Sequence, residues 1–267
     1  MFQGEREKLI SDRAIAYAFV IKLRKEEIKM YNSKKVLKMV VLAMLVALGV
    51  VISPILRVEG MCPMAHFINI VCSVLMGPWY SLLCATTIGI IRMITMGIPP
   101  IALTGAVFGA FLSGVFYKTS KGNLLMAVLG EVIGTGIIGA VLSYPVMTIF
   151  WGKEGLSWVF YIPSFICGTL IGGSIAFAFL MKLSKSGVLA RFQGMLGGAR
   201  YETETGIFGE SLAIAAIGVM LFAVTAVVRD LLNIQGLLWS YVPYGFIVVF
   251  LVIAIIYFFR RVKNAHK

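Results

Sequence analysis

The segment RVEGMCPMAHFINI, residues 57–70, holds a histidine and an asparagine between two strongly apolar runs. Pro63 suits the first position of a helix, because its φ is already helical and its missing N–H is not needed there. His66 and Asn69 then lie three residues apart on one face of that helix. Because an imidazole and an amide can both donate and accept hydrogen bonds, this face predicts a binding site for a small polar or aromatic solute.

The chain around this segment is too apolar for a soluble protein. Hydrophobic residues make up 60 % and charged residues 13 % of its 267 residues, more apolar surface than a soluble domain could bury. We therefore predict an all-α polytopic membrane protein in contact with lipid. The net charge of +12 does not indicate a nucleic-acid partner, because the basic residues lie in short groups between apolar runs, as the positive-inside rule describes.

Apolar runs of about 20 residues, the length that crosses the hydrocarbon core, divide the chain into spans. We expect spans at 36–56, 63–76, 79–96, 100–117, 124–150, 158–181, 211–228 and 237–259. With the N-terminus inside, the loops rich in lysine and arginine all fall on the cytoplasmic side of the plasma membrane. Both termini are therefore expected to be cytoplasmic.

These spans imply four segments. Residues 34–185 should form a six-span substrate-binding domain, 186–210 a cytoplasmic linker, and 211–267 a two-span hairpin with a basic tail. Residues 1–33 should be a cytoplasmic segment, or in part an over-long start, since Met30 opens a stretch more usual for the beginning of a membrane protein.

Polar side chains from five spans fall at similar depths near the outer face, taking about 1.5 Å of rise per residue. They are His66, Asn69, Arg92, Thr104, Tyr144 and Ser164. Since ionisable residues inside a membrane are costly, we predict that this layer binds the substrate. Glu131 is seven residues from the inner end of its span and is expected to lie apart from the layer, where it could pair with a neighbouring helix or a cytoplasmic lysine.

Each member of this layer also has a simpler role open to it. His66 could tie its loop to a carbonyl, Arg92 could extend to the outer headgroups, and Tyr144 could belong to an interfacial belt. Thr104 and Ser164 could bond to the backbone of their own helices.

Small residues recur four positions apart in several spans, which lets helix backbones approach closely. The pairs are Ala43 and Ala47, Gly105 and Gly109, Ala110 and Gly114, Gly130 and Gly134, and Gly168 and Gly172. Packing within the chain is the expected role of most of them. Ala43 and Ala47, on a first span with otherwise bulky faces, are the best candidates for docking a partner helix.

Sequence motifs for catalysis are missing. The chain has no GxxxxGK[ST] phosphate loop, no HExxH and no GxSxG. Cys62 and His66 would lack further ligands for zinc, because the only other histidine is His266. We therefore expect no enzyme activity, no metal site and no cofactor.

Four stretches between residues 62 and 117 carry a family resemblance: CPMAHFIN, VLMGPWYSLL, IIRMITMG and ALTGAVFGAFLSGVFY. They resemble the ThiW family, and the resemblance covers about residues 34–185. Members of this family are presumed to be substrate-binding S components of energy-coupling factor (ECF) transporters for hydroxyethylthiazole, a thiamine precursor.

The resemblance implies capture of a thiazole for uptake powered by other subunits, a transmembrane scaffold and two cytosolic ATPases. It implies that Ala43 and Ala47 dock on the scaffold, and that a loop with Arg57 and Glu59 gates the site.

Two other classes of protein function stay open. A secondary transporter would need an inverted repeat or an acidic coupling residue, and an intramembrane enzyme would need two catalytic groups at one depth.

Overall fold

The computed structural model describes Arg24 and residues 33–54, 62–197, 201, 207–231 and 236–265. These residues form helices joined by turns and short loops, and no strand occurs among them. Six helices in the described part are long and apolar enough to cross a membrane. The predicted fold class, an all-α polytopic membrane protein, is confirmed.

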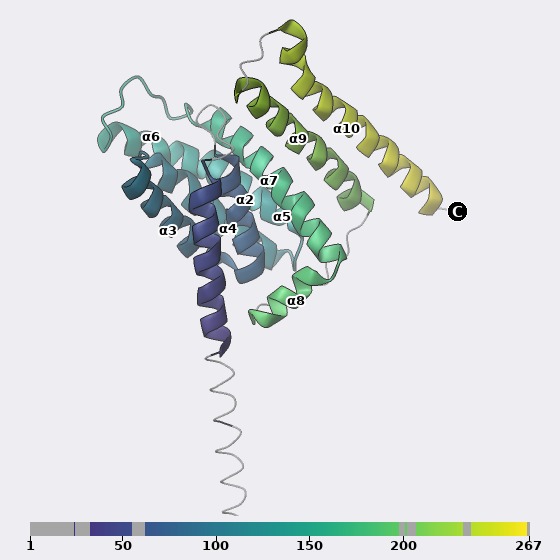
Figure 1. The fold of residues 1–267 in the computed structure, drawn as a ribbon, viewed down its shortest axis with the longest axis horizontal. Coiled ribbons are helices and arrows are strands. Elements are labelled where there is room, and N and C mark those ends of the chain that lie inside the picture. Colours follow the sequence, from purple (N-terminus) through teal and green to yellow (C-terminus); the bar gives the residue numbers. More distant parts are fainter. Residues whose placement is uncertain are drawn as a thin grey trace, which may run out of the picture. The chain divides into compact units, whose positions relative to one another are not determined.

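The helices follow the predicted spans closely (Figure 1). In chain order they are Ser33–Ile52, α2 (Pro63–Met76), α3 (Pro78–Met96), α4 (Ile101–Thr119), α5 (Leu124–Ile133), the π-helical segment η1 (Gly134–Gly139), α6 (Ala140–Ile149), α7 (Ile162–Lys185), α8 (Val188–Met195), α9 (Ile207–Leu231) and α10 (Leu237–Ala265). Segments α5, η1 and α6 run on as the predicted fifth span. The sixth begins at Ile162 rather than at 158, because Pro163 in its first turn sets the start.

Helix α2 is the shortest of the predicted spans. Its 14 residues reach only about 21 Å, less than the roughly 30 Å of a bilayer core. It starts at Pro63 and ends at Gly77, whose φ of 90° is accessible to glycine without strain. Pro78 then starts α3 at once. Such a short helix is tolerated where protein rather than lipid surrounds its ends.

Helix α4 is central to the bundle, in contact with α2, α3, α5, η1 and α6. Two glycines on the neighbouring segment make this close packing possible. A Cβ at Gly130 would lie 2.5 Å from the carbonyl oxygen of Leu112, and one at Gly134 would lie 2.5 Å from that of Phe108. These contacts agree with the expectation that most small-residue pairs serve packing within the chain.

We expect Gly134→Ala to destabilise the protein by about 1–3 kcal/mol, the usual cost of overpacking. The added methyl group would meet backbone atoms of α4, which cannot rotate away. Thermal unfolding in detergent measures the effect. The matched control is Gly245→Ala on α10, where nothing lies within 4 Å of the added Cβ. An unchanged melting temperature for Gly134→Ala would mean that α4 and η1 are not this close.

The chain divides into two compact units, residues 1–41 and 42–267. Within the second unit, the end of the first helix has two different faces. Leu42 and Leu45 are buried, whereas Ala43 and Ala47 are exposed together with Leu48. The small-residue pair predicted to dock a partner therefore lies on the face that this unit leaves uncovered.

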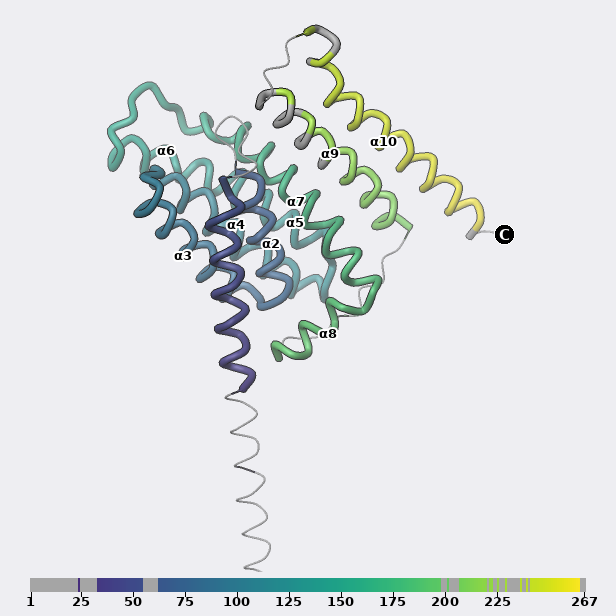
Figure 2. Tube along the Cα trace, viewed as in Figure 1, coloured from purple at the N-terminus to yellow at the C-terminus, as the bar shows by residue number. Residues whose placement is uncertain are grey.

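The C-terminal helices α9 and α10 lie side by side, and α9 packs on α7 (Figure 2). Glu210 joins all three. Its carboxylate accepts hydrogen bonds from Lys185 Nζ at 2.7 Å and from the Tyr257 hydroxyl at 2.7 Å. The pair of C-terminal spans expected from the sequence is thus fastened to the six-span part.

The predicted linker, 186–210, contains helix α8. Gln193 on this helix is 1 % exposed. Its Nε2 donates to the carbonyl of Val74 and to the hydroxyl of Tyr117, both at 2.9 Å. Because a buried amide needs such partners, Gln193 fixes α8 against the ends of α2 and α4.

Candidate functional site

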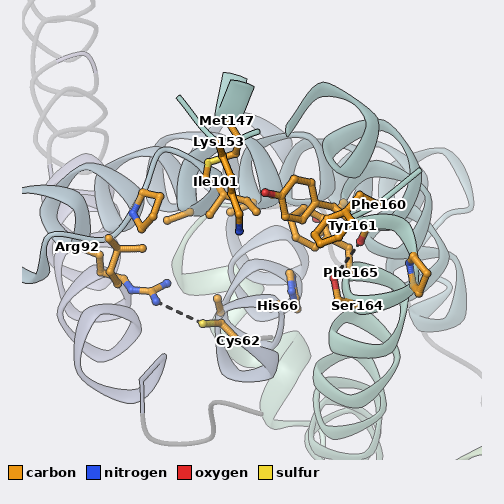
Figure 3. Close-up of a pocket in the computed structure, with 18 residues that line it drawn as sticks. Cys62, His66, Arg92, Ile101, Met147, Lys153, Phe160, Tyr161, Ser164 and Phe165 are labelled. Atoms are coloured by element: carbon orange, nitrogen blue, oxygen red, sulfur yellow. Dashed lines mark hydrogen bonds between the residues drawn. The ribbon is translucent and has the colours of Figure 1, made fainter. Parts of the chain in front are cut away.

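A cavity of about 510 Å³ lies among α2, α3, α4, η1, α6, α7 and the loop before α7 (Figure 3). It is lined by Cys62, Ala65, His66, Arg92, Ile98, Pro99, Ile101, Ala102, Gly105, Ala106, Thr135, Met147, Lys153, Phe160, Tyr161, Pro163, Ser164 and Phe165. Most of these side chains are apolar, and a few polar ones stand among them. Such a lining is typical of sites for small organic molecules.

Helix α2 brings His66 to the cavity wall. Gly172 of α7 allows this position, because a Cβ there would collide with the carbonyl oxygen of Pro63 and lie 2.9 Å from His66 Cβ. The Nδ1 atom of His66 lies 2.9 Å from Glu131 Oε1. An ionised carboxylate only accepts hydrogen bonds, so we assign the His66 tautomer that carries its proton on Nδ1. In that tautomer the other ring nitrogen, Nε2, is an acceptor for a ligand in the cavity that His66 lines.

Glu131 is the centre of a buried polar cluster behind His66. The side chain is 0 % exposed, and its Oε1 also accepts from Asn69 Nδ2 at 3.0 Å and from the Thr135 hydroxyl at 3.3 Å. Its Oε2 has no partner among the described residues. Three donors on one oxygen suit a carboxylate, so Glu131 holds His66 and Asn69 in fixed orientations.

The expectation that Glu131 lies apart from the polar layer is wrong. The number of residues between a side chain and the end of its helix gives its depth only if every helix starts at the same level. The fifth span has 26 residues, about 39 Å, whereas α2 has 14, about 21 Å. The start of α2 abuts Gly172, near the middle of α7. His66 therefore lies deeper than counted, level with Glu131.

Arg92 of α3 is turned into the protein. It is 4 % exposed and lines the cavity. Its Nη2 donates to Cys62 Sγ at 3.4 Å, and its Nε has no partner in the described part of the chain. The alternative in which this side chain extends to outer headgroups is therefore not what the structure shows.

The other predicted site residues divide into two groups. Ser164 lines the cavity, and its hydroxyl donates to the Tyr161 carbonyl at 3.1 Å. Asn69, Thr104 and Tyr144 are not among the described lining residues. Asn69 lies behind His66 and also donates to the carbonyl of Ala106 at 3.3 Å.

Thr104 and Tyr144 support the walls from outside the cavity. The Thr104 hydroxyl pairs with that of Ser143 at 2.6 Å, tying α4 to α6. Tyr144 packs on Trp158, with ring centroids 4.6 Å apart. The predicted gate residues, Arg57 and Glu59, lie outside the described residues.

Lys153, Tyr161 and Thr135 are among the lining residues that were not assigned to the site from the sequence. Lys153 and Tyr161 lie between α6 and α7, outside the helices from which the polar layer was predicted. Their place in the sequence could have identified them, because both come from the segment that joins the fifth span to the sixth. The Tyr161 hydroxyl is buried without a partner among the described residues.

Comparison with known families gives one match. A sequence model of the ThiW family, described as thiamine-precursor transporter protein, matches residues 39–186, more than half of the chain. The chain belongs to the ThiW family. No curated protein and no solved structure matches it.

The ThiW match covers the elements that build the cavity. It runs from the first helix to the end of α7, so every lining residue falls within it, whereas α8, α9 and α10 lie beyond it. Membership of ThiW makes this chain a thiamine-precursor transporter protein. With six long apolar helices in the described part of the chain, it is a multi-pass membrane protein.

Proposed function

We propose that this protein is the S component of an ECF-type transporter and captures hydroxyethylthiazole from outside the cell. The observation that carries the proposal is the cavity within the family-matched region, with His66 held by Glu131 at its wall. Within a transporter family, such a site is expected to bind its solute rather than convert it.

The cavity chemistry suits a thiazole. The ring can pack on Phe165 and Met147, while its nitrogen or its hydroxyl bonds to His66 Nε2 and to the Tyr161 hydroxyl. Buried polar groups without partners cost free energy. A ligand that bonds to the Tyr161 hydroxyl, which has no partner among the described residues, and also to His66 would therefore be held by few polar contacts, as small-molecule ligands usually are.

Transport would need partners, because the chain carries no phosphate loop. We propose that Ala43 and Ala47 dock on a transmembrane scaffold that works with two cytosolic ATPases. Small residues on an exposed helix face allow the close approach that this docking needs.

The plasma membrane is the expected location, with both termini cytoplasmic, because lysine and arginine are concentrated in the loops of the cytoplasmic side.

The test is reconstitution. Purified protein should bind hydroxyethylthiazole, yet show no ATP hydrolysis and no accumulation in liposomes, with or without an ion gradient. Adding the scaffold and its ATPases should produce ATP-dependent uptake. Titration calorimetry and radiolabelled uptake measure the two steps separately, so loss of one can be seen without loss of the other.

A secondary transporter remains the second candidate, and Glu131 is the observation that favours it. A buried acid beside a substrate cavity is a common coupling group in ion-driven transport. Under that function, uptake by the protein alone would follow a proton gradient and would be lost in Glu131→Gln. Such a result would overturn the S-component proposal.

A further inference from the structure

The charges around the cavity are unbalanced. Arg92 and Lys153 both line it, but no aspartate or glutamate is among its described lining residues. Figure 3 shows the two cationic side chains reaching toward the same space from different walls, with His66 beside them. Two described acids neighbour lining residues without lining the cavity themselves. Glu131 is already engaged by His66, Asn69 and Thr135, and Glu154 follows Lys153 on the exposed loop, with no ion pair between them.

Of the two basic residues, Arg92 gives the stronger evidence for an anionic ligand. At 4 % exposure, its guanidinium is largely removed from solvent, where an unpaired charge is costly. A cysteine sulfur at 3.4 Å is a weak acceptor, and Nε has no partner in the described residues. A guanidinium with free donors at a cavity is a typical site for a carboxylate or a phosphate.

Lys153 adds a second positive charge at the cavity, from a different wall. It lies on an exposed loop, with its Nζ 6.0 Å from the centroid of the Phe160 ring. None of the described acids forms an ion pair with it. Its ammonium can therefore turn to a ligand that enters the cavity.

We propose that the preferred ligand carries an anionic group, a carboxylate or a phosphate, which Arg92 and Lys153 bind. The inference rests on the proposed function for the heterocycle itself. It adds that a thiazole precursor with an acid or a phosphate ester on its side chain is preferred to the neutral alcohol. The apolar ring then packs on Phe165, with His66 at its polar edge.

The test compares ligands that share a ring and differ in charge. Hydroxyethylthiazole, its phosphate monoester and the matching thiazole acetic acid are titrated against the purified protein. Charged hydrogen bonds predict that the two anions bind roughly 10- to 150-fold more tightly than the alcohol. This ratio should fall as salt is raised, because screening weakens the ionic contacts.

Single substitutions test whether Arg92 and Lys153 cause the preference for anions over the alcohol. Arg92→Gln is expected to remove most of the ratio between anion and alcohol, Arg92→Lys to keep part of it, and Lys153→Gln to reduce it. Lys182→Gln, an exposed lysine outside the cavity, is the control for loss of one charge. Melting curves accompany each titration. If the Arg92 variants unfold, Lys153→Gln still tests the proposal, because Lys153 lies on an exposed loop and its substitution should leave the fold intact.

The two proposals fail in different ways. Equal binding of alcohol and anions, or a ratio that survives in both Arg92→Gln and Lys153→Gln, overturns the anion inference and leaves the thiazole function standing. Phenylacetate and 2-phenylethanol form a second pair without the heterocycle. If phenylacetate is preferred through Arg92 while no thiazole binds, the inference stands and the thiazole function falls. Binding of none of these compounds rejects both.

Discussion

Replacing Ala47 with tryptophan is expected to abolish uptake while ligand binding stays at its native level. Ala47 and Ala43 lie on the exposed face of the first helix, where a large ring would hold a partner helix away. A clash of about 1.4 kcal/mol or more would weaken association at least tenfold. Pull-down of the scaffold and ATP-dependent uptake in proteoliposomes measure the loss.

The control for this change is Ile94→Trp on α3. Ile94 is 79 % exposed and belongs to no small-residue pair, so a tryptophan there adds the same bulk to a different exposed surface. It should leave both association and uptake intact. Native scaffold association in Ala47→Trp and Ala43→Trp would show that the scaffold docks elsewhere.

Removing the carboxylate of Glu131 is expected to damage both folding and binding. Glu131→Ala would leave His66 Nδ1, Asn69 Nδ2 and the Thr135 hydroxyl without their shared acceptor. Breaking a buried pair of this kind costs about 3–5 kcal/mol. Glu131→Gln, which keeps an acceptor oxygen, should cost less. Thermal unfolding and ligand titration on the same preparations measure the two effects.

Variants of the residues bonded to Glu131 distinguish a side chain that contacts the ligand from one that only holds the cavity wall in place. His66→Ala should weaken binding by about 1–3 kcal/mol, roughly 5- to 150-fold, because His66 lines the cavity. Asn69→Ala should lower the melting temperature more than the affinity, since Asn69 lies behind the wall. Glu154→Ala, at an exposed acid of the loop before α7, is the control. Native stability and affinity in Glu131→Ala would remove any role for the cluster.

The sequence by itself determined the membrane class, the approximate bounds of the long helices and the start of α2. These depend on local properties, namely the length of each apolar run and the fixed φ of Pro63. It also identified His66 and Arg92 as polar groups too costly to face lipid, and both line the cavity. The resemblance of CPMAHFIN and its neighbouring stretches to ThiW agreed with the family match over residues 39–186.

Only the tertiary structure decided which of the polar side chains meet. Glu131 contacts His66 across 65 positions of sequence, whereas Asn69, Thr104 and Tyr144, predicted at the same depth, stay outside the cavity. Spacing along one helix defines its faces, but not the level at which the helix begins or the neighbour that a face meets. The level of α2 and the neighbours of its faces depend on its contact with α7 at Gly172. This contact joins segments that are far apart in the chain.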